Sequence, residues 1–263
     1  MPRFAANVSL LFGEVDFLAR FAAARDNGFR AVECLFPYAH PAVDLASQRS
    51  AAGLEVALFN SYPGDWQQGE RGIAALPGRE AEFRASFAVT LQYARALSCS
   101  NIHVLSGLAA GNGADQRRCY VANLRWAADH AARDGINVLV EALNAKDMPN
   151  YLVASVDAAL AIIHEADRPN VRLQLDLYHV GMMGGRLAET LRAVIGLTRH
   201  IQIAGVPGRH EPDVTQEIDY PQLFALIDEL GYRGWVGCEY RPRGATAEGL
   251  GWGTPWGLGQ PGR

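Results

Sequence analysis

The sequence predicts an α/β protein, a (β/α)₈ TIM barrel. Its 263 residues match the roughly 250 that such a barrel needs. Strand-like and helix-like patterns alternate along most of the chain, which is typical of βα units around a parallel sheet. Four apolar runs in the second half each place a polar side chain near their C-terminal ends, where the strands of a closed barrel converge. We therefore expect a single TIM-barrel domain over residues 1–263, with a Gly/Trp-rich tail from about residue 244.

Short apolar runs give eight candidate strands. They are Phe4–Leu11, Ala31–Phe36, Glu55–Ser61, Asn101–Ser106, Asn137–Leu143, Val171–Leu177, His200–Val206 and Trp235–Tyr240. Helix-like patterns lie between many of these runs, for example Phe17–Asn27, Glu80–Leu97, Gln116–Arg133, Val156–Glu165, Leu187–Val194 and Tyr220–Leu230. Gly28, Gly135 and Gly231 follow three of these helices at or near the C′ position that glycine favours.

A doubly wound sheet of the Rossmann or flavodoxin type is the main alternative architecture. It needs a phosphate-binding glycine turn after its first strand, and the residues LFGE at 11–14 have no GxGxxG pattern. The barrel is therefore favoured.

Composition and charge narrow the classes of partner. Hydrophobic residues make up 49% of the chain and charged residues 20%, as in an ordinary globular protein with a substantial core. The net charge of −4 and the pI near 6.0 supply no basic stripe for a phosphate backbone, so nucleic acid is disfavoured. No apolar run reaches the roughly 18 residues of a membrane span, and the N-terminus has no apolar signal region. We expect a cytoplasmic enzyme that acts on a small molecule.

The four cysteines are scattered. They are Cys34, Cys99, Cys119 and Cys238. They have no CxxC spacing and mostly sit in apolar contexts, so we expect them to be buried and reduced.

Two segments fall outside the βα pattern. The loop Tyr62–Gly78 exceeds ordinary connector length and indicates a functional lid, with a surface excursion as the alternative. The tail contains Trp252 and Trp256 among several glycines, and rings of this size rarely stay in water without a partner. We expect the loop and tail to close over the barrel mouth, or the tail to pack on the barrel or on a second subunit of a homo-oligomer.

Four polar side chains at corresponding strand ends form the candidate site. They are Glu141, Asp176, Gln202 and Glu239. Buried carboxylates are costly unless a cation or hydrogen bonds compensate them. If the four runs are neighbouring strands of one barrel, their ends converge on a single pocket. Three carboxylates and one amide oxygen suit Mg²⁺ or Mn²⁺ better than Zn²⁺, so we expect a divalent metal there.

Each of these residues also has a structural interpretation. Glu141 could cap the next helix, Gln202 could hydrogen-bond a neighbour, and Glu239 could pair with Arg241. Four such interpretations would have to coincide at four corresponding strand ends, which favours a shared site.

Two further side chains are candidates for substrate binding. His179 lies just beyond the sixth predicted strand, where it could contact a substrate, although a structural role is the alternative. Arg209 follows the seventh strand, and its rigid fork suits a substrate carboxylate. Barrels often bind anions near strands seven and eight, but a surface-loop arginine is the other interpretation.

The residue types indicate a reaction class. Ser106 lacks the GxSxG frame of a nucleophile elbow, so serine hydrolysis is disfavoured. Two carboxylates beside a metal suit proton abstraction next to a carbonyl, with the cation stabilising the enediolate oxygens. The predicted class is aldose–ketose isomerisation or epimerisation.

Five segments carry a resemblance to a known family. They are MPRFAAN at the start, FPY at 36–38, LPGRE at 76–80, HIQIAGVPGRHEP at 200–212 and GCEYRP at 237–242. They resemble the hydroxypyruvate isomerase family, which lies within the xylose-isomerase-like TIM barrels and includes the closely similar 2-oxo-tetronate isomerases. The resemblance runs over nearly the whole chain. QIAGVP, EAL at 141–143 and the ending PRGATAEGLGW are closer to the 2-oxo-tetronate type.

The resemblance implies roles for the candidate residues. Glu141 and Glu239 would donate and accept the proton, and the metal ligands would be Glu141, Asp176, Gln202 and Glu239. The related sugar epimerases usually have histidine where Gln202 stands. His179 matches a substrate-contacting histidine of those epimerases, and Arg209 falls near their substrate-binding arginine.

The implied activity interconverts hydroxypyruvate and tartronate semialdehyde, or isomerises a 2-oxo-tetronate. A sugar 3-epimerase of the same superfamily and a non-catalytic carboxylate-binding barrel are two alternatives.

Overall fold

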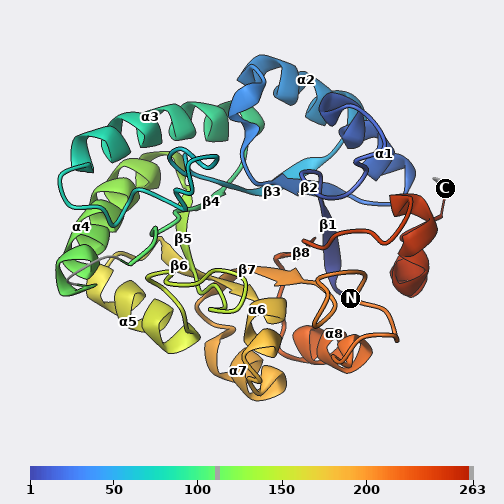
Figure 1. Cartoon of the computed structure of the whole chain (residues 1–263). Coiled ribbons are helices and arrows are strands. Elements are labelled where there is room, and N and C mark those ends of the chain that lie inside the picture. The colour runs from blue at the N-terminus through green and yellow to red at the C-terminus, as the bar shows by residue number, and fades with distance from the viewer. Residues whose placement is uncertain (110–112, 261–263) are drawn as a thin grey trace.

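The computed structural model describes residues 1–109 and 113–260, and its centre is a closed barrel of eight parallel strands (Figure 1). The strands are β1 (Arg3–Asn7), β2 (Ala31–Cys34), β3 (Glu55–Asn60), β4 (Asn101–His103), β5 (Asn137–Glu141), β6 (Val171–Asp176), β7 (Thr198–Ile203) and β8 (Trp235–Cys238). They follow one another around the barrel in chain order, and β8 closes against β1. The α/β class, the (β/α)₈ barrel and all eight predicted strands are confirmed.

Helices surround the barrel on the outside (Figure 1). They are α1 (Arg20–Asp26), α2 (Ala42–Ala52), α3 (Glu80–Leu97), α4 (Gly113–Ala131), α5 (Val156–Ala166), α6 (Leu177–Met182), α7 (Leu187–Val194) and α8 (Tyr220–Glu229). Short 3-10 helices cover Phe17–Ala19, Pro37–Ala39 and Ala132–Asp134, and a longer one covers Thr246–Trp256. The bounds predicted for α3 and α7 agree with the structure. In α3, Phe83, Phe87 and Leu91 recur every fourth residue and are buried against the barrel.

The end of β6 differs from the prediction in a way that affects the site. The predicted strand continued to Leu177, whereas Leu177 begins helix α6. The cause is a helix cap: the Asp176 carboxylate accepts a hydrogen bond from the backbone N–H of Tyr178 at 2.8 Å. His179, predicted to lie just beyond the strand, therefore lies on the first turn of a helix.

A polar cluster occupies the barrel interior, and we call it the interior cluster. It consists of Asn7, Glu33, Gln174, His200 and Gln202. The Glu33 carboxylate accepts hydrogen bonds from Asn7 at 3.0 Å and from Gln202 at 2.8 Å, and His200 Nε2 lies 2.5 Å from its other oxygen. Gly237 makes room for this carboxylate, because a Cβ atom there would overlap Glu33. Hydrogen-bonded polar groups thus occupy this part of the barrel interior.

The tail packs against the flank of the barrel. Trp252 and Trp256 make edge contacts with Phe4 of β1, with ring centroids 5.3 and 5.9 Å apart, and Trp256 also contacts Phe224 of α8. In Figure 1 the red tail lies outside the strands. The prediction that the tail packs on the barrel is confirmed for its described part, and residues 261–263 lie outside the described range.

The cysteine prediction is also confirmed. All four are buried and none forms a disulfide within the described ranges. In those same ranges, no helix is long and apolar enough to cross a membrane.

Candidate active site

A cavity of about 480 Å³ opens at the carboxyl end of the barrel. Its wall includes Trp66, Glu141, Asp147, His179, Arg209, Glu239 and Arg241. Trp66 comes from the loop Tyr62–Gly78, so this loop forms part of the wall. No residue of the tail from 244 to 260 lines the cavity, so the expected closure of the mouth by the tail is not found there.

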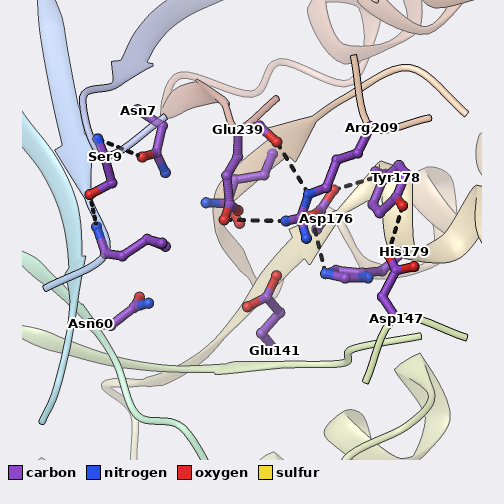
Figure 2. Close-up of polar contacts among 12 residues, drawn as sticks. Asn7, Ser9, Asn60, Glu141, Asp147, Asp176, Tyr178, His179, Arg209 and Glu239 are labelled. Atoms are coloured by element: carbon purple, nitrogen blue, oxygen red, sulfur yellow. Dashed lines mark hydrogen bonds and ion pairs between the residues drawn. The ribbon is translucent and has the colours of Figure 1, made fainter. Parts of the chain in front are cut away.

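The three predicted carboxylates gather around this mouth. Glu141 is the last residue of β5, Asp176 is the last residue of β6, and Glu239 directly follows β8. Figure 2 shows the guanidinium of Arg209 between Glu239 and Asp176, with Glu141 facing them across the site. We call Glu141, Asp176, Arg209 and Glu239 the mouth cluster.

Glu141 is buried and has little compensation for its charge. Its Oε2 lies 3.5 Å from His103 Nδ1, and its Oε1 has no hydrogen-bond partner among the described residues. Burial, and then the negative charge of Glu239, raise the pKa of Glu141 well above its ordinary value. A cation or a proton is needed to stabilise this side chain.

Asp176 and Glu239 share one arginine. Arg209 Nη2 lies 3.2 Å from Glu239 Oε1 and 3.6 Å from Asp176 Oδ2. Burial raises the pKa of Glu239 to about 8 and that of Asp176 to about 6, although the charge of Arg209 acts in the opposite direction on both. Asp176 Oδ2 has no hydrogen bond within the part of the chain that the structure describes. One guanidinium does not offset two buried carboxylates.

The surroundings of His179 determine which of its ring nitrogens carries hydrogen. Nδ1 lies 3.2 Å from the backbone nitrogen of Asn144 and 2.6 Å from the side-chain nitrogen of the same residue. The backbone N–H can only donate, and the Asn144 side-chain oxygen already accepts two backbone hydrogen bonds, so Nδ1 is an acceptor. Burial lowers the pKa of His179 well below its ordinary value, so the ring is neutral and its hydrogen sits on Nε2. Nε2, 3.5 Å from Asp176 Oδ2, is then a hydrogen-bond donor at the cavity wall.

Gln202 belongs to the interior cluster by its hydrogen bonds. Its Nε2 donates to Glu33, and its Oε1 accepts from Gln174 Nε2 at 2.6 Å. Its Cα pairs with that of Asp176 across β6 and β7, so the residue stands next to the mouth cluster without lining the cavity.

Arg209 differs from its surface-loop interpretation. Its side chain is largely buried, its Cζ lies 4.9 Å from the centre of the Tyr178 ring, and both Glu239 and Asp176 are close to it. The ion pair suggested between Glu239 and Arg241 is not formed, because Arg209 takes that place.

Several cavity residues were missed by the sequence analysis. His103 ends β4 and could have been found by applying the strand-end criterion to the first half of the chain. Asp147 accepts a hydrogen bond from the Tyr178 hydroxyl at 2.6 Å, a pairing that no local pattern indicates. Burial lowers the pKa of His103 to about 3, so this side chain is neutral.

The donor set fits a hard cation. Ligand atoms of Glu141, Asp176 and His179 lie within 4.8 Å of one another. Glu141 Oε1 and Asp176 Oδ2 are buried without hydrogen bonds in the described residues, and carboxylate oxygens are the ligands that Mg²⁺ and Mn²⁺ prefer. His179 presents N–H and not a lone pair, so the carboxylates are the fitting donors.

Comparison with known proteins first identifies the class of protein to which the chain belongs. A family model described as a xylose isomerase-like TIM barrel matches residues 21–256. The chain is 51% identical to the 2-oxo-tetronate isomerase of Cupriavidus necator, over 97% of this chain and 99% of that protein. It is 43% identical to the hydroxypyruvate isomerase of Escherichia coli, over 97% of this chain and 100% of that protein.

A solved structure has nearly the same fold. The crystal structure of "AP endonuclease, family 2" from Brucella melitensis has a TM-score of 0.95 at 47% identity, and the match covers 97% of this chain and 99% of that one. The family model and the two isomerases show that the chain belongs to the hydroxypyruvate isomerase family of the xylose isomerase-like TIM barrels. The family predicted from the sequence motifs is confirmed.

Proposed function

We propose that this protein isomerises a short 2-oxo acid by moving a proton between two neighbouring carbons. The observation that carries the proposal is the pair Glu141 and Glu239, two buried glutamates that line one cavity from β5 and from the end of β8. Burial raises the pKa of Glu239 to about 8, close to the range in which a carboxyl group can both take and return a proton near neutral pH.

The residues of the mouth have separate parts in the proposed reaction. With hydroxypyruvate, one glutamate takes a proton from C3 and a proton returns at C2 from the other glutamate. The hydroxyl hydrogen passes from the oxygen on C3 to the oxygen on C2. His179 Nε2–H would donate a hydrogen bond to one of these oxygens, and Arg209 would offset the charge of Glu239 and Asp176.

A divalent cation, Mg²⁺ or Mn²⁺, would be held by Glu141, Asp176 and Glu239, and it would supply positive charge for the enediolate oxygens. Gln202 is the fourth proposed ligand, since an amide oxygen keeps a second lone pair after accepting from Gln174. Thermal unfolding checks this proposal without an activity assay. Added Mn²⁺ should raise the unfolding temperature of the wild type, because at a hundred times its Kd it adds about 2.7 kcal/mol to the unfolding free energy. It should have little effect on the unfolding temperature of Glu141→Gln.

The substrate that we favour is a 2-oxo-tetronate, with hydroxypyruvate second. The relatives named 2-oxo-tetronate isomerase include proteins at 51% and 48% identity, whereas the E. coli hydroxypyruvate isomerase is at 43%. The two substrates differ by one hydroxymethylene unit, and a pocket discriminates such a difference by only about 1–3 kcal/mol. We therefore expect both acids to turn over at different rates.

A side-by-side assay tests the proposal. Wild-type protein is given 2-oxo-tetronate or hydroxypyruvate with Mg²⁺ or Mn²⁺, and NMR in D₂O identifies which carbon exchanges its hydrogen. We expect exchange and isomerisation between C2 and C3, with the higher kcat/KM for 2-oxo-tetronate. Exchange at C3 of a free ketose without turnover of either acid would instead establish a 3-epimerase. Binding without product under every metal condition would establish a non-catalytic carboxylate-binding barrel.

No specific feature of the site favours a sugar 3-epimerase or an endonuclease. D-psicose 3-epimerase from Clostridium cellulolyticum shares the fold, with a TM-score of 0.78 at 17% identity. The Brucella protein is named an endonuclease, whereas this chain has a net charge of −4 and an acidic mouth cluster, which do not favour binding to a phosphate backbone. A cytoplasmic location and a homo-oligomer stay predictions.

A further inference from the structure

The cavity wall contains both acidic and basic side chains that an anionic substrate would meet. Glu141, Asp147 and Glu239 line the cavity, and Asp176 lies directly behind them. The wall also contains two arginines, Arg209 and Arg241, and the planar fork of an arginine suits a substrate carboxylate.

Arg209 is not free for this task. Its Nη2 lies 3.2 Å from Glu239 Oε1 and 3.6 Å from Asp176 Oδ2, and its Nε donates to the backbone oxygen of Glu239. A substrate carboxylate bound there would have to compete with two buried carboxylates.

Arg241 is the other arginine in the cavity wall, and its guanidinium is unengaged. Among the described residues, no ion pair, hydrogen bond or ring contact involves the Arg241 side chain. Its backbone is fixed on both sides, since its N–H donates to the Arg209 carbonyl oxygen at 2.8 Å and its own carbonyl oxygen accepts from His210 Nδ1 at 2.8 Å. Arg241 is exposed at the cavity wall, so a carboxylate in the cavity could pair with it without first breaking an ion pair.

The alternation of side chains after β8 aims Arg241 at the mouth. Glu239 and Arg241 both line the cavity, whereas Tyr240 between them is buried on the other side against Trp252 of the tail. Two residues along an extended segment span roughly 7 Å. Arg241 can thus reach the end of a substrate whose neighbouring carbon faces Glu239.

We propose that Arg241 binds the carboxylate of the substrate and so determines the preference for 2-oxo acids over neutral ketoses. This inference rests on the proposed isomerase function and adds its specificity residue. Arginine suits the task because its planar fork can make two parallel hydrogen bonds to one carboxylate.

The test compares two ligands that differ at the carboxylate alone. Hydroxypyruvate and dihydroxyacetone have the same three-carbon skeleton, with a carboxylate in the first and a hydroxymethyl group in the second. The variants are Arg241→Gln, Arg241→Lys and a matched control, Arg243→Gln. Arg243 lies two residues further along, does not line the cavity, and is paired with Glu211 at 3.1 Å and Asp213 at 2.7 Å. Kinetics and calorimetry are run with the same metal concentration throughout.

We expect Arg241→Gln to raise KM and Kd for hydroxypyruvate roughly 10–100-fold, with a smaller change in kcat. Arg241→Lys should fall between the wild type and Arg241→Gln, because it keeps the charge and loses the fork. The response to dihydroxyacetone should stay within about twofold, and Arg243→Gln should leave both ligands within about twofold.

Two results would overturn the inference. One is an Arg241→Gln variant that binds and turns over hydroxypyruvate as well as Arg243→Gln does. The other is an equal loss for dihydroxyacetone, which would indicate general damage to the mouth. Failure of the isomerase proposal itself would be seen earlier and separately, as wild-type protein that turns over neither acid.

Discussion

The interior cluster and the mouth cluster are two groups of buried polar side chains in one barrel. They differ in whether their carboxylate oxygens have hydrogen-bond partners. Both oxygens of Glu33 in the interior cluster are engaged by Asn7, Gln202 and His200. In the mouth cluster, Glu141 Oε1 and Asp176 Oδ2 have no hydrogen bond from the described residues. A buried carboxylate with every oxygen satisfied supports the fold, whereas one left unsatisfied is available for a ligand. Burial alone would not have separated the two groups.

The two clusters also come from different parts of the barrel. The interior cluster joins β1, β2, β6 and β7 across the lumen, and the mouth cluster gathers at the ends of β5, β6 and β8. Gln202 stands at the boundary, because Glu33 holds its amide nitrogen while its backbone pairs with Asp176. The interior cluster thus fixes the orientation of an amide that lies beside the mouth.

The largest effect should come from removing the mouth glutamates one at a time. Glu141→Gln and Glu239→Gln keep the shape of the side chain but cannot take a proton, so turnover should fall by roughly 10²–10⁴-fold. The unfolding temperature should be unchanged or higher, because a poorly compensated buried carboxyl group is replaced by a neutral amide. Steady-state kinetics and thermal unfolding measure both effects, with the exposed Glu189→Gln on α7 as the control. Normal turnover in both mouth variants would contradict the proposed mechanism.

For Glu33 in the interior cluster we expect the opposite result, a loss of stability with a much smaller loss of turnover. Glu33→Gln would place an amide among the donors of Asn7, Gln202 and His200, which should cost about 3 kcal/mol of unfolding free energy. Denaturant unfolding measures the loss, and turnover is measured well below the unfolding temperature. If the interior cluster is structural, turnover of the folded fraction should fall far less than in Glu141→Gln. A variant as stable as the wild type would show that the comparison between the clusters is wrong.

How much of the fold and of the site could be predicted depends on how far apart in the sequence the interacting residues lie. The eight strands followed from local apolar runs, and the strand-end positions of Glu141, Asp176 and Glu239 brought three predicted residues to one mouth. The sequence did not show that Gln202 differs from these three residues, because the group that binds its amide is Glu33, which is 169 residues away in the sequence. The pairing of Arg209 with Glu239 and Asp176 is likewise a tertiary contact that no spacing indicates.

The tail is a third region for the comparison between structural and functional groups, because it packs on the barrel and does not line the cavity. Trp252→Ala should lower the unfolding free energy by about 2 kcal/mol, below the roughly 3–5 kcal/mol of a fully buried ring, since Trp252 is half-buried against Phe4 and Tyr240. KM and kcat of the folded protein should stay near wild-type values. A large rise in KM with unchanged stability would instead place the tail over the mouth, as first expected from the sequence.

The smallest effect is expected from thiol reagents, which probe how closed the barrel is around the interior cluster. Cys34, Cys99 and Cys238 are buried beside it, and burial, with the negative charge of Glu33 as a lesser cause, raises the pKa of each thiol, to about 12 for Cys99. Because the thiolate is the reactive form, native protein at pH 8 should react negligibly with Ellman's reagent, and the unfolded protein should react at all four cysteines. Glu33→Gln should increase the rate in the native protein by favouring local opening, whereas Glu141→Gln should not. Rapid reaction of Cys34, Cys99 or Cys238 in native wild-type protein would mean that the region around Glu33 opens readily, and that its hydrogen bonds do not make it a closed structural cluster.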